Sequence, residues 1–187
     1  MTIFTMGHST LPIETFLRIL AANSARMLVD VRTIPRSRHN PQFERHSLEE
    51  SLTRAGIGYQ WMPALGGLRP ARKDSINLGW RNSSFRGYAD YMQTPEFTAA
   101  LEDLILTGAG RQTCIQCAEA VPWRCHRSLI ADALTARELP VEHILYDAKG
   151  NSKRNPHVLT SFAKVHGTRV WYPPEEPLFA QSSEPAG

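Results

Sequence analysis

The sequence predicts a single three-layer α/β domain, with a mostly parallel, Rossmann-like central sheet of about five strands and helices on both faces. Short apolar runs of the kind that form buried strands alternate with segments in which apolar residues recur at helical spacing. With 187 residues, of which 42% are hydrophobic and 21% charged, the chain is long enough to bury one ordinary core. This composition excludes a collagen-like, coiled-coil or disordered chain.

Five apolar runs are predicted to be the strands of the sheet. Each is bounded by polar or turn-forming residues, and they cover 3–6, 27–31, 57–62, 113–117 and 141–146. The fourth run is unusual, because Cys114 and Gln116 stand where a buried strand normally has apolar residues. Parallel strands need long crossover connections, so the segments between these runs should contain helices.

Four intervening segments are predicted to be helices, from their apolar spacing and their start signals. Before the first helix, Ser9 and Thr10 offer capping oxygens, and Pro12 lies in the first turn, where an N–H has no helical partner. Ser47 begins a capping box for the second helix, and Thr94 is expected to cap the third. The fourth helix has its apolar residues within 129–134.

Residues 1–170 are expected to form the single domain, and residues 171–187 a disordered C-terminal tail, since the end of the chain is rich in Pro, Ser and Glu. Within the domain, residues 63–84 form a long stretch without clear periodicity. This stretch is too apolar for a plain linker, which favours a functional loop.

The protein is expected to be cytoplasmic and to have no membrane partner. No apolar run approaches the roughly 20 residues that cross a bilayer, and the N-terminal segment lacks the basic and apolar regions of a signal peptide. The three cysteines are an odd number, which argues against a disulfide framework. Catalytic, metal-binding or simply buried thiols remain as interpretations.

Positive charge is concentrated in one part of the chain. Residues 26–86 contain ten arginines and one lysine against five acids, a net charge of +6, so the remainder has −3 of the total of +3. Arginine outnumbers lysine 17 to 4, and its planar guanidinium suits bidentate binding of phosphate or carboxylate groups. This segment is a candidate to bind an anionic small molecule or a nucleic acid, and the alternative is a solvated basic face.

Polar clusters follow three of the predicted strands, which is where ligands bind in open α/β sheets. These clusters are 7–9, 30–32 and 117–119, and a fourth, 124–127, begins the last helix. Because the carboxyl ends of parallel strands meet at one edge of the sheet, we expect the four clusters to form one pocket. Taken singly, each cluster is also typical of a turn or a helix cap.

Cys117 and Cys125 are the most informative residues chemically. Both lie near a predicted helix N-terminus and among cationic residues, namely Arg124, His126 and Arg127. Backbone N–H groups and positive charge favour a thiolate, which would be a nucleophile or a redox group. The alternative is that Cys117 is a small buried apolar residue, as we expect of Cys114.

Two other interpretations of these cysteines stay open. The spacing from Cys117 to Arg124 approximately resembles the phosphate-binding loop of cysteine phosphatases and rhodaneses, although Glu119 and Pro122 suit an anion-binding loop poorly. The other interpretation is a metal site, although a Cys-x7-Cys-His spacing matches no zinc motif. Its candidate ligands are Cys117, Cys125, His126 and His8.

The second cluster continues into an arginine-rich loop. Three arginines follow the second strand within seven residues, as is typical of an anion-binding loop: Arg32, Arg36 and Arg38. Asp30 is expected either to pair with Arg32 or to orient His8. The glycine pair Gly66–Gly67 is either a plain turn or a place where the backbone approaches a ligand closely.

Several motifs occur in a specific order within residues 3–146. They are Gly7-His8-Ser9, Val29-Asp30-Val31-Arg32 with Pro35, Ser37-Arg38 and Phe43, Leu65-Gly66-Gly67, Tyr88 with Tyr91-Met92, and Cys117-Ala118-Glu119 with Cys125-His126-Arg127. This combination resembles the domain of unknown function 488 family, whose members are bacterial and archaeal. The resemblance implies a compact α/β fold and brings no established biochemical activity with it.

We therefore expect an enzyme that acts on an anionic, nucleotide or nucleic-acid-like substrate, with Cys117 or Cys125 as nucleophile or redox thiol; no cofactor is identified. The proton-transferring residues would be His8, Asp30, Glu119 and His126. The substrate-binding residues would be Ser9, Arg32, Arg36, Arg38, Gly66, Gly67 and Arg127. The alternative is a non-catalytic nucleic-acid-binding module, which has no use for a thiol and would stack bases on Tyr59, Trp61 and Trp80.

Overall fold

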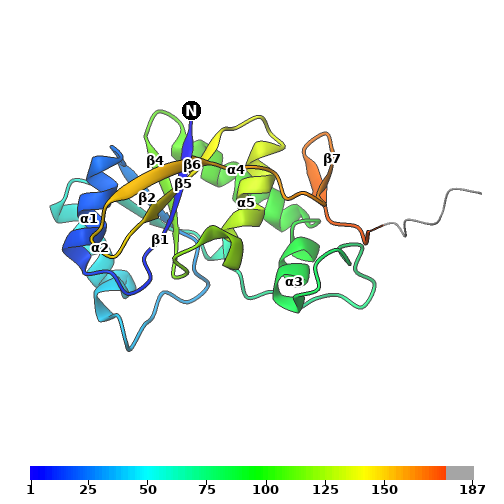
Figure 1. Cartoon of the computed structure of the whole chain (residues 1–187), viewed down its shortest axis with the longest axis horizontal. Helices are drawn as coiled ribbons and strands as arrows, with labels where there is room; N and C mark the ends of the chain where they lie inside the picture. Colours follow the sequence, from blue (N-terminus) through cyan, green and yellow to red (C-terminus); the bar gives the residue numbers. More distant parts are fainter. Residues whose placement is uncertain (176–187) are drawn as a thin grey trace, which may run out of the picture.

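A six-stranded sheet forms the centre of the computed structural model, which describes residues 1–175 (Figure 1). The strands are β1 (Ile3–Gly7), β2 (Met27–Asp30), β3 (Gly58–Trp61), β4 (Thr113–Cys117), β5 (Val141–Tyr146) and β6 (Ser152–Pro156). They lie in the order β3-β2-β4-β1-β5-β6. The first five strands in this order are parallel, and β6 pairs antiparallel with β5. The mostly parallel sheet is thus confirmed.

Helices cover both faces of the sheet, as predicted (Figure 1). One face packs against α1 (Ile13–Ala22) and α2 (Arg45–Arg54). The other face is covered by α3 (Ser83–Tyr91), α4 (Pro95–Gly108) and α5 (Arg127–Thr135), with the small hairpin of β7 (Lys164–His166) and β8 (Arg169–Trp171) beside them. Three short turns of 3₁₀-helix join these elements: η1 (Pro41–Phe43), η2 (Pro63–Leu65) and η3 (Pro122–Arg124).

The sheet separates two apolar clusters, because successive side chains of a strand point to opposite faces. Phe4 and Met6 of β1 pack on the side of α1 and α2, whereas Ile3 packs on the other side. In β4 the same alternation places Cys114 with the first cluster and Cys117 with the second. The two central strands, β1 and β4, are parallel and pair Gly7 with Cys117, so their carboxyl ends lie next to each other at one edge of the sheet.

Some predicted helix starts are wrong. Helix α1 begins after Pro12 and has no side-chain cap, so neither Ser9 nor Thr10 caps it. Helix α2 begins at Arg45, ahead of the capping box that Ser47 was expected to start, because η1 leads directly into it and Glu44 is its first flanking residue. The prediction for α4 is confirmed, since the Thr94 hydroxyl accepts a hydrogen bond from the N–H of Phe97.

Helix α3 begins at the end of the stretch 63–84 that we expected to be irregular, and it was not predicted from the sequence. Its sequence contains Gly87, which weakens a helix, but the backbone of Arg69 approaches so closely that a Cβ at Gly87 would lie 2.2 Å from the Arg69 carbonyl oxygen. The signal we overlooked is Asn82, whose side chain accepts from the N–H groups of Ser84 and Phe85. Tertiary packing therefore stabilises a helix that local propensity does not predict.

The folded part of the chain extends beyond the boundary expected at residue 170. Trp171 ends β8, and Tyr172 is fully buried, with its hydroxyl donating to Asp132 at 2.7 Å. The rest of the expected tail, residues 176–187, lies outside the described residues. None of the helices within residues 1–175 is both long and hydrophobic enough to span a membrane.

Candidate functional site

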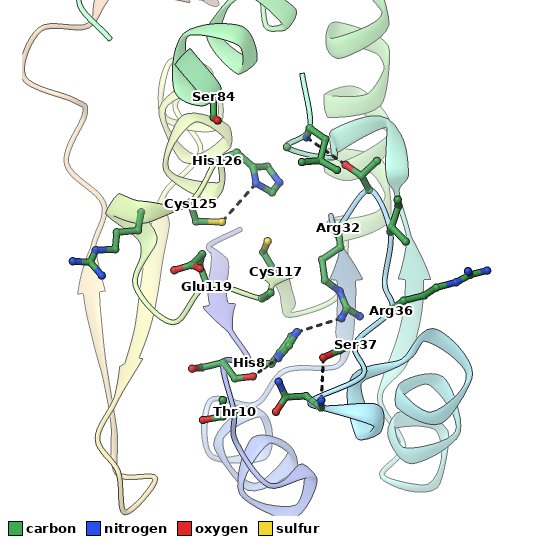
Figure 2. A pocket seen from close by; sticks show the side chains of 18 of the residues that line it. His8, Thr10, Arg32, Arg36, Ser37, Ser84, Cys117, Glu119, Cys125 and His126 are labelled. Carbon is green, nitrogen blue, oxygen red and sulfur yellow. Dashed lines mark hydrogen bonds between the residues drawn. The ribbon is translucent and has the colours of Figure 1, made fainter. Parts of the chain in front are cut away.

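A pocket of about 550 Å³ lies at the carboxyl ends of β1, β2 and β4 (Figure 2). Residues from all four predicted clusters line it, among them His8, Ser9, Arg32, Arg36, Cys117, Glu119, Arg124, Cys125 and His126. The loops after β1 and β4 are joined directly, because His8 N–H donates to the Cys117 carbonyl at 3.0 Å and Ser9 N–H donates to the Ala118 carbonyl at 2.8 Å. The structure therefore places the four clusters around one cleft.

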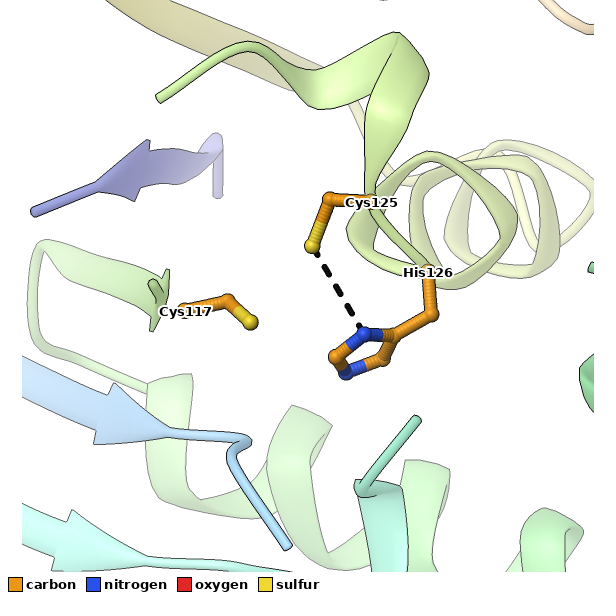
Figure 3. Close-up of side chains that lie close together, drawn as sticks. All are labelled: Cys117, Cys125 and His126. Atoms are coloured by element: carbon orange, nitrogen blue, oxygen red, sulfur yellow. Dashed lines mark hydrogen bonds between the residues drawn. The ribbon is translucent and has the colours of Figure 1, made fainter. Parts of the chain in front are cut away.

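Cys125 and His126 face the pocket together at the start of α5 (Figure 3). The Cys125 sulfur lies 3.6 Å from Nδ1 of His126. The other ring nitrogen, Nε2, lies 3.2 Å from the carbonyl oxygen of Val31, which can only accept a hydrogen bond. Nε2 therefore holds the proton, and the lone pair of Nδ1 is directed at the sulfur.

The imidazole of His126 is held in this orientation by two neighbours. A Cβ at Gly67 would lie 2.5 Å from Nδ1, so the backbone can lie against the ring only because this residue is glycine. The second neighbour is Tyr88, whose ring lies 5.0 Å from the imidazole between centroids. The Tyr88 hydroxyl donates to the carbonyl of Leu65, which fixes the ring to the loop that contains Gly67.

The two pocket thiols differ in their acidity. A hydrogen bond from Cys117, together with the positive charge of the neighbouring Arg127, lowers the pKa of Cys125 well below its ordinary value. The same hydrogen bond and burial raise the pKa of Cys117, so Cys117 is the thiol that donates. Cys114 is fully buried on the other face of the sheet, and burial raises its pKa to about 12. The predicted contrast between a site thiol and an inert thiol thus has a structural basis.

Arg127 supplies buried positive charge near the thiols, although it does not line the pocket. Its side chain is 1% exposed, and it donates to the carbonyl of Glu119 and to the Thr5 hydroxyl. Within residues 1–175, no carboxylate pairs with it and its Nε has no hydrogen-bond partner. An uncompensated buried cation is unfavourable, so the site favours a thiolate or a bound anion near this guanidinium.

Asp30 and His8 have positioning contacts. Asp30 is fully buried and pairs with Arg32, with a shortest distance of 2.5 Å, while also accepting from the Tyr59 hydroxyl at 2.9 Å. Arg32 in turn lies 3.2 Å from Nε2 of His8, whose Nδ1 lies 2.7 Å from the Ser9 carbonyl. Both ring nitrogens of His8 are therefore engaged. Burial lowers the pKa of His8 to about 4, so the ring is neutral near pH 7.

Of the other predicted site residues, Arg36 and Glu119 line the pocket, whereas Arg38 and Gly66 do not. Arg36 is exposed, and Figure 2 shows its side chain extending away from the two thiols. Arg38 is exposed and does not line the pocket, and Gly66 packs against Thr33. Glu119 is exposed at the pocket wall.

Several residues that shape the site were not assigned a role from the sequence. Phe43 stacks on the His8 ring at 4.0 Å between centroids, Tyr88 contacts His126, and the Val31 carbonyl fixes its tautomer. Phe43 and Tyr88 belong to the ordered motifs, which was the available signal. The role of the Val31 carbonyl could not be predicted, because every residue has a backbone carbonyl and the residue type does not reveal its contacts.

The aromatic residues expected to stack nucleic-acid bases have internal contacts. Tyr59 donates to Asp30, and the indole N–H of Trp61 donates to the Arg32 carbonyl at 2.9 Å. Trp80 packs among the aromatic rings of Phe85, Phe162 and Tyr172. All three rings are therefore partly buried and engaged in contacts within the protein, rather than exposed for stacking on bases.

Three side chains are arranged so that they could hold a metal ion. The ligand atoms of Cys117, Cys125 and His126 all lie within 4.8 Å of one another, and both cysteines are buried. His8, the fourth candidate from the sequence, is not part of this group, because its ring nitrogens contact Ser9 and Arg32.

Comparison with known families gives one result. A family model described as "Domain of unknown function DUF488" matches residues 12–134, which is more than half of the chain. The match includes both pocket cysteines, His126 and the Gly66–Gly67 loop, whereas His8 precedes it. No curated protein and no solved structure is significantly similar to the chain.

Proposed function

The chain belongs to the DUF488 family, and we propose that it is an enzyme that acts on an anionic, nucleotide or nucleic-acid-like substrate with Cys125 as its nucleophile. One observation supports this most strongly. The Cys125 sulfur lies 3.6 Å from an imidazole nitrogen whose ring is oriented by a third group, the Val31 carbonyl. A nucleophile next to a base, with the base oriented by a third group, is the arrangement that covalent catalysis requires.

The chemistry assigned to these groups is a displacement at an electrophilic centre. The Cys125 sulfur forms a bond to the electrophilic atom of the substrate, and the electron pair of the broken bond leaves with the departing group. The thiol proton passes to Nδ1 of His126, which then returns it to the departing group. Before the attack, the S–H of Cys117 donates a hydrogen bond to the Cys125 sulfur. After the attack, water hydrolyses the bond between the sulfur and the substrate fragment, and its proton restores the Cys125 thiol.

Positive charge favours an anionic substrate. Arg127 lies buried beside the thiols without a carboxylate partner among the described residues, while Arg32 and Arg36 come from the segment with a net charge of +6. Arg32 is fixed by Asp30, so its guanidinium is already oriented before a substrate binds. A pocket of about 550 Å³ is large enough for a nucleotide-sized ligand.

A turnover screen tests this proposal. Nucleotides and short single-stranded oligonucleotides are incubated with the wild-type chain and with the Cys125→Ala and Cys114→Ala variants, and products are detected by mass spectrometry. We expect turnover by the wild type and by Cys114→Ala, and none by Cys125→Ala. Tight binding of these compounds without turnover, unchanged in Cys125→Ala, would instead favour the non-catalytic binding module.

A further inference from the structure

We propose that Cys117, Cys125 and His126 form a binding site for one Zn²⁺ ion, and that the ion holds the nucleophilic thiol inactive. The inactivation rests on the function proposed above, whereas the metal site stands on its own geometry. The site would be new in its sequence pattern, because the Cys-x7-Cys-His spacing matches no zinc motif.

The distances fit a tetrahedral ion. With Zn–S of about 2.3 Å and Zn–N of about 2.05 Å, the ligand sulfur and nitrogen of a tetrahedral site lie about 3.6 Å apart. The Cys125 sulfur and Nδ1 of His126 are separated by 3.6 Å. Two sulfur ligands of such a site are about 3.8 Å apart. Since all three ligand atoms lie within 4.8 Å of one another, the Cys117 sulfur needs to move by about 1.2 Å at most.

Two adjacent residues can both point at one ion because the backbone changes conformation between them. Cys125 is extended, with φ −135° and ψ 144°, whereas His126 is helical, with φ −56° and ψ −14°. Figure 3 shows the side chains of both residues directed toward Cys117, which comes from the end of β4. The ligands therefore converge from a strand end and a helix start, an arrangement that a spacing rule does not describe.

The surroundings of the three ligands suit a metal. His126 donates Nε2–H to the Val31 carbonyl, which leaves Nδ1 free, and a backbone carbonyl is a common partner of the second nitrogen of a metal-bound histidine. Two thiolates neutralise the charge of Zn²⁺.

Three protein ligands leave one coordination position of a tetrahedral ion for water or another ligand, and this position would face the pocket. The metal and an electrophilic substrate would compete for the same electron pair of Cys125. Zinc occupancy and nucleophilic attack are thus alternative states of one centre.

Cobalt substitution and thiol labelling test the inference together. The purified chain is stripped with a chelator and titrated with Co²⁺, whose tetrahedral thiolate complexes absorb strongly in the visible and near ultraviolet. We expect saturation at one Co²⁺ per chain, displacement by Zn²⁺, loss of these bands in Cys117→Ser and Cys125→Ser, and unchanged bands in Cys114→Ser. Circular dichroism verifies that each variant is folded.

Iodoacetamide labelling then separates the two proposals. Zn²⁺ should abolish the labelling of Cys125 in the stripped protein, and chelator should restore it. A reactive Cys125 in a chain that binds neither Co²⁺ nor Zn²⁺ would overturn the metal site and leave the proposed function standing. A chain that binds one Co²⁺ but whose stripped form has an unreactive Cys125 would overturn the proposed function and leave the metal site standing. Metal binding that leaves labelling unchanged would overturn the inactivation.

Discussion

His126 donates its Nε2–H to the carbonyl of Val31 across 3.2 Å, and this contact turns Nδ1 toward Cys125. The hydrogen bond joins the residue after β2 to the start of α5. The orientation of the imidazole is consequently set by the relative position of two elements that are far apart in the sequence. Changes that displace the ring should alter the chemistry of Cys125 while leaving the fold intact.

Gly67→Ala tests this orientation. The added Cβ would lie 2.5 Å from Nδ1 of His126, so the ring must leave its present position beside Cys125. We expect the rate of iodoacetamide labelling of Cys125 in the metal-free protein at pH 7 to fall several-fold, with little change in circular dichroism. Leu68→Ala is the matched control, because Leu68 is the next residue and is 73% exposed. Equal rates in both variants would argue against the orienting role of Gly67.

Gly7→Ala should destabilise the chain, because a Cβ at this position would lie 1.6 Å from the Glu119 carbonyl oxygen and 2.8 Å from the Arg127 guanidinium. We expect a loss of about 1–3 kcal/mol or more in the free energy of unfolding, measured by urea denaturation. In Gly108→Ala the nearest atom is 3.4 Å away and the residue ends a helix, so this control should be neutral or slightly stabilising. A Gly7→Ala variant as stable as the wild type would contradict the close packing of β1 against the loop after β4.

Asp30→Asn should destabilise the chain far more than loss of an exposed ion pair. Arg32 is 7% exposed and would become a buried cation without a carboxylate, which costs about 3 kcal/mol or more. The control is Glu50→Gln, which removes the pair with Arg54 in which both side chains are 69% exposed and should cost less than about 1 kcal/mol. Urea denaturation measures the free energy of unfolding of both variants. Equal losses in the two would contradict the role assigned to the buried pair.

The chain should lose stability as the pH falls from about 6.5 to about 4, in part through His143. Burial lowers the pKa of His143 to about 4, so over this range the unfolded chain binds a proton that the folded chain does not. The expected contribution is on the order of 3 kcal/mol at the acid end. In the buried network His143 contacts Thr5 and His157.

Urea denaturation across this pH range should show a smaller acid loss in His143→Asn than in the wild type. His39→Asn is the control, because His39 is exposed. An unchanged acid loss in His143→Asn would show that protonation of His143 is not what destabilises the chain.

Arg36→Ala should weaken the binding of an anionic ligand more than Arg38→Ala does. Arg36 lines the pocket, whereas Arg38 lies outside it, although both are exposed and two residues apart. Binding of a fluorescent short oligonucleotide should also weaken as salt rises from about 50 to 200 mM, since phosphate contacts release counterions. Equal affinities of the two variants would indicate diffuse attraction to the basic segment rather than binding in the pocket.

The sequence predicted the fold well where one rule decides the outcome. The Thr94 cap and the β4 run 113–117 match the structure, because capping and burial act locally. The gathering of four polar clusters at one sheet edge also followed from topology alone, since parallel strands place their carboxyl ends together. Helix α3 was missed because its Asn82 cap was overlooked and because the close approach of Arg69 to Gly87, a tertiary contact, has no signal in the sequence.

The internal organisation of the site was harder to predict. Asp30 was left between two roles, and the structure places it against Arg32, with His8 reached only through that arginine. Arg36 and Arg38 look equivalent in the sequence, yet the path of the loop brings only Arg36 to the pocket wall. The Val31 carbonyl orients His126, and a backbone group leaves no pattern in residue types.

Thiol labelling resolved by residue tests the central claim most directly. The native chain is treated with iodoacetamide at pH 7, with and without prior chelation, and the three cysteines are quantified by peptide mass spectrometry against the denatured chain. The account predicts that Cys125 of the chelator-treated protein is labelled while Cys114 is not, because Cys125 lies in the pocket beside His126 and Cys114 is fully buried. Three unreactive cysteines under both conditions, in a chain that labels fully when denatured, would contradict it.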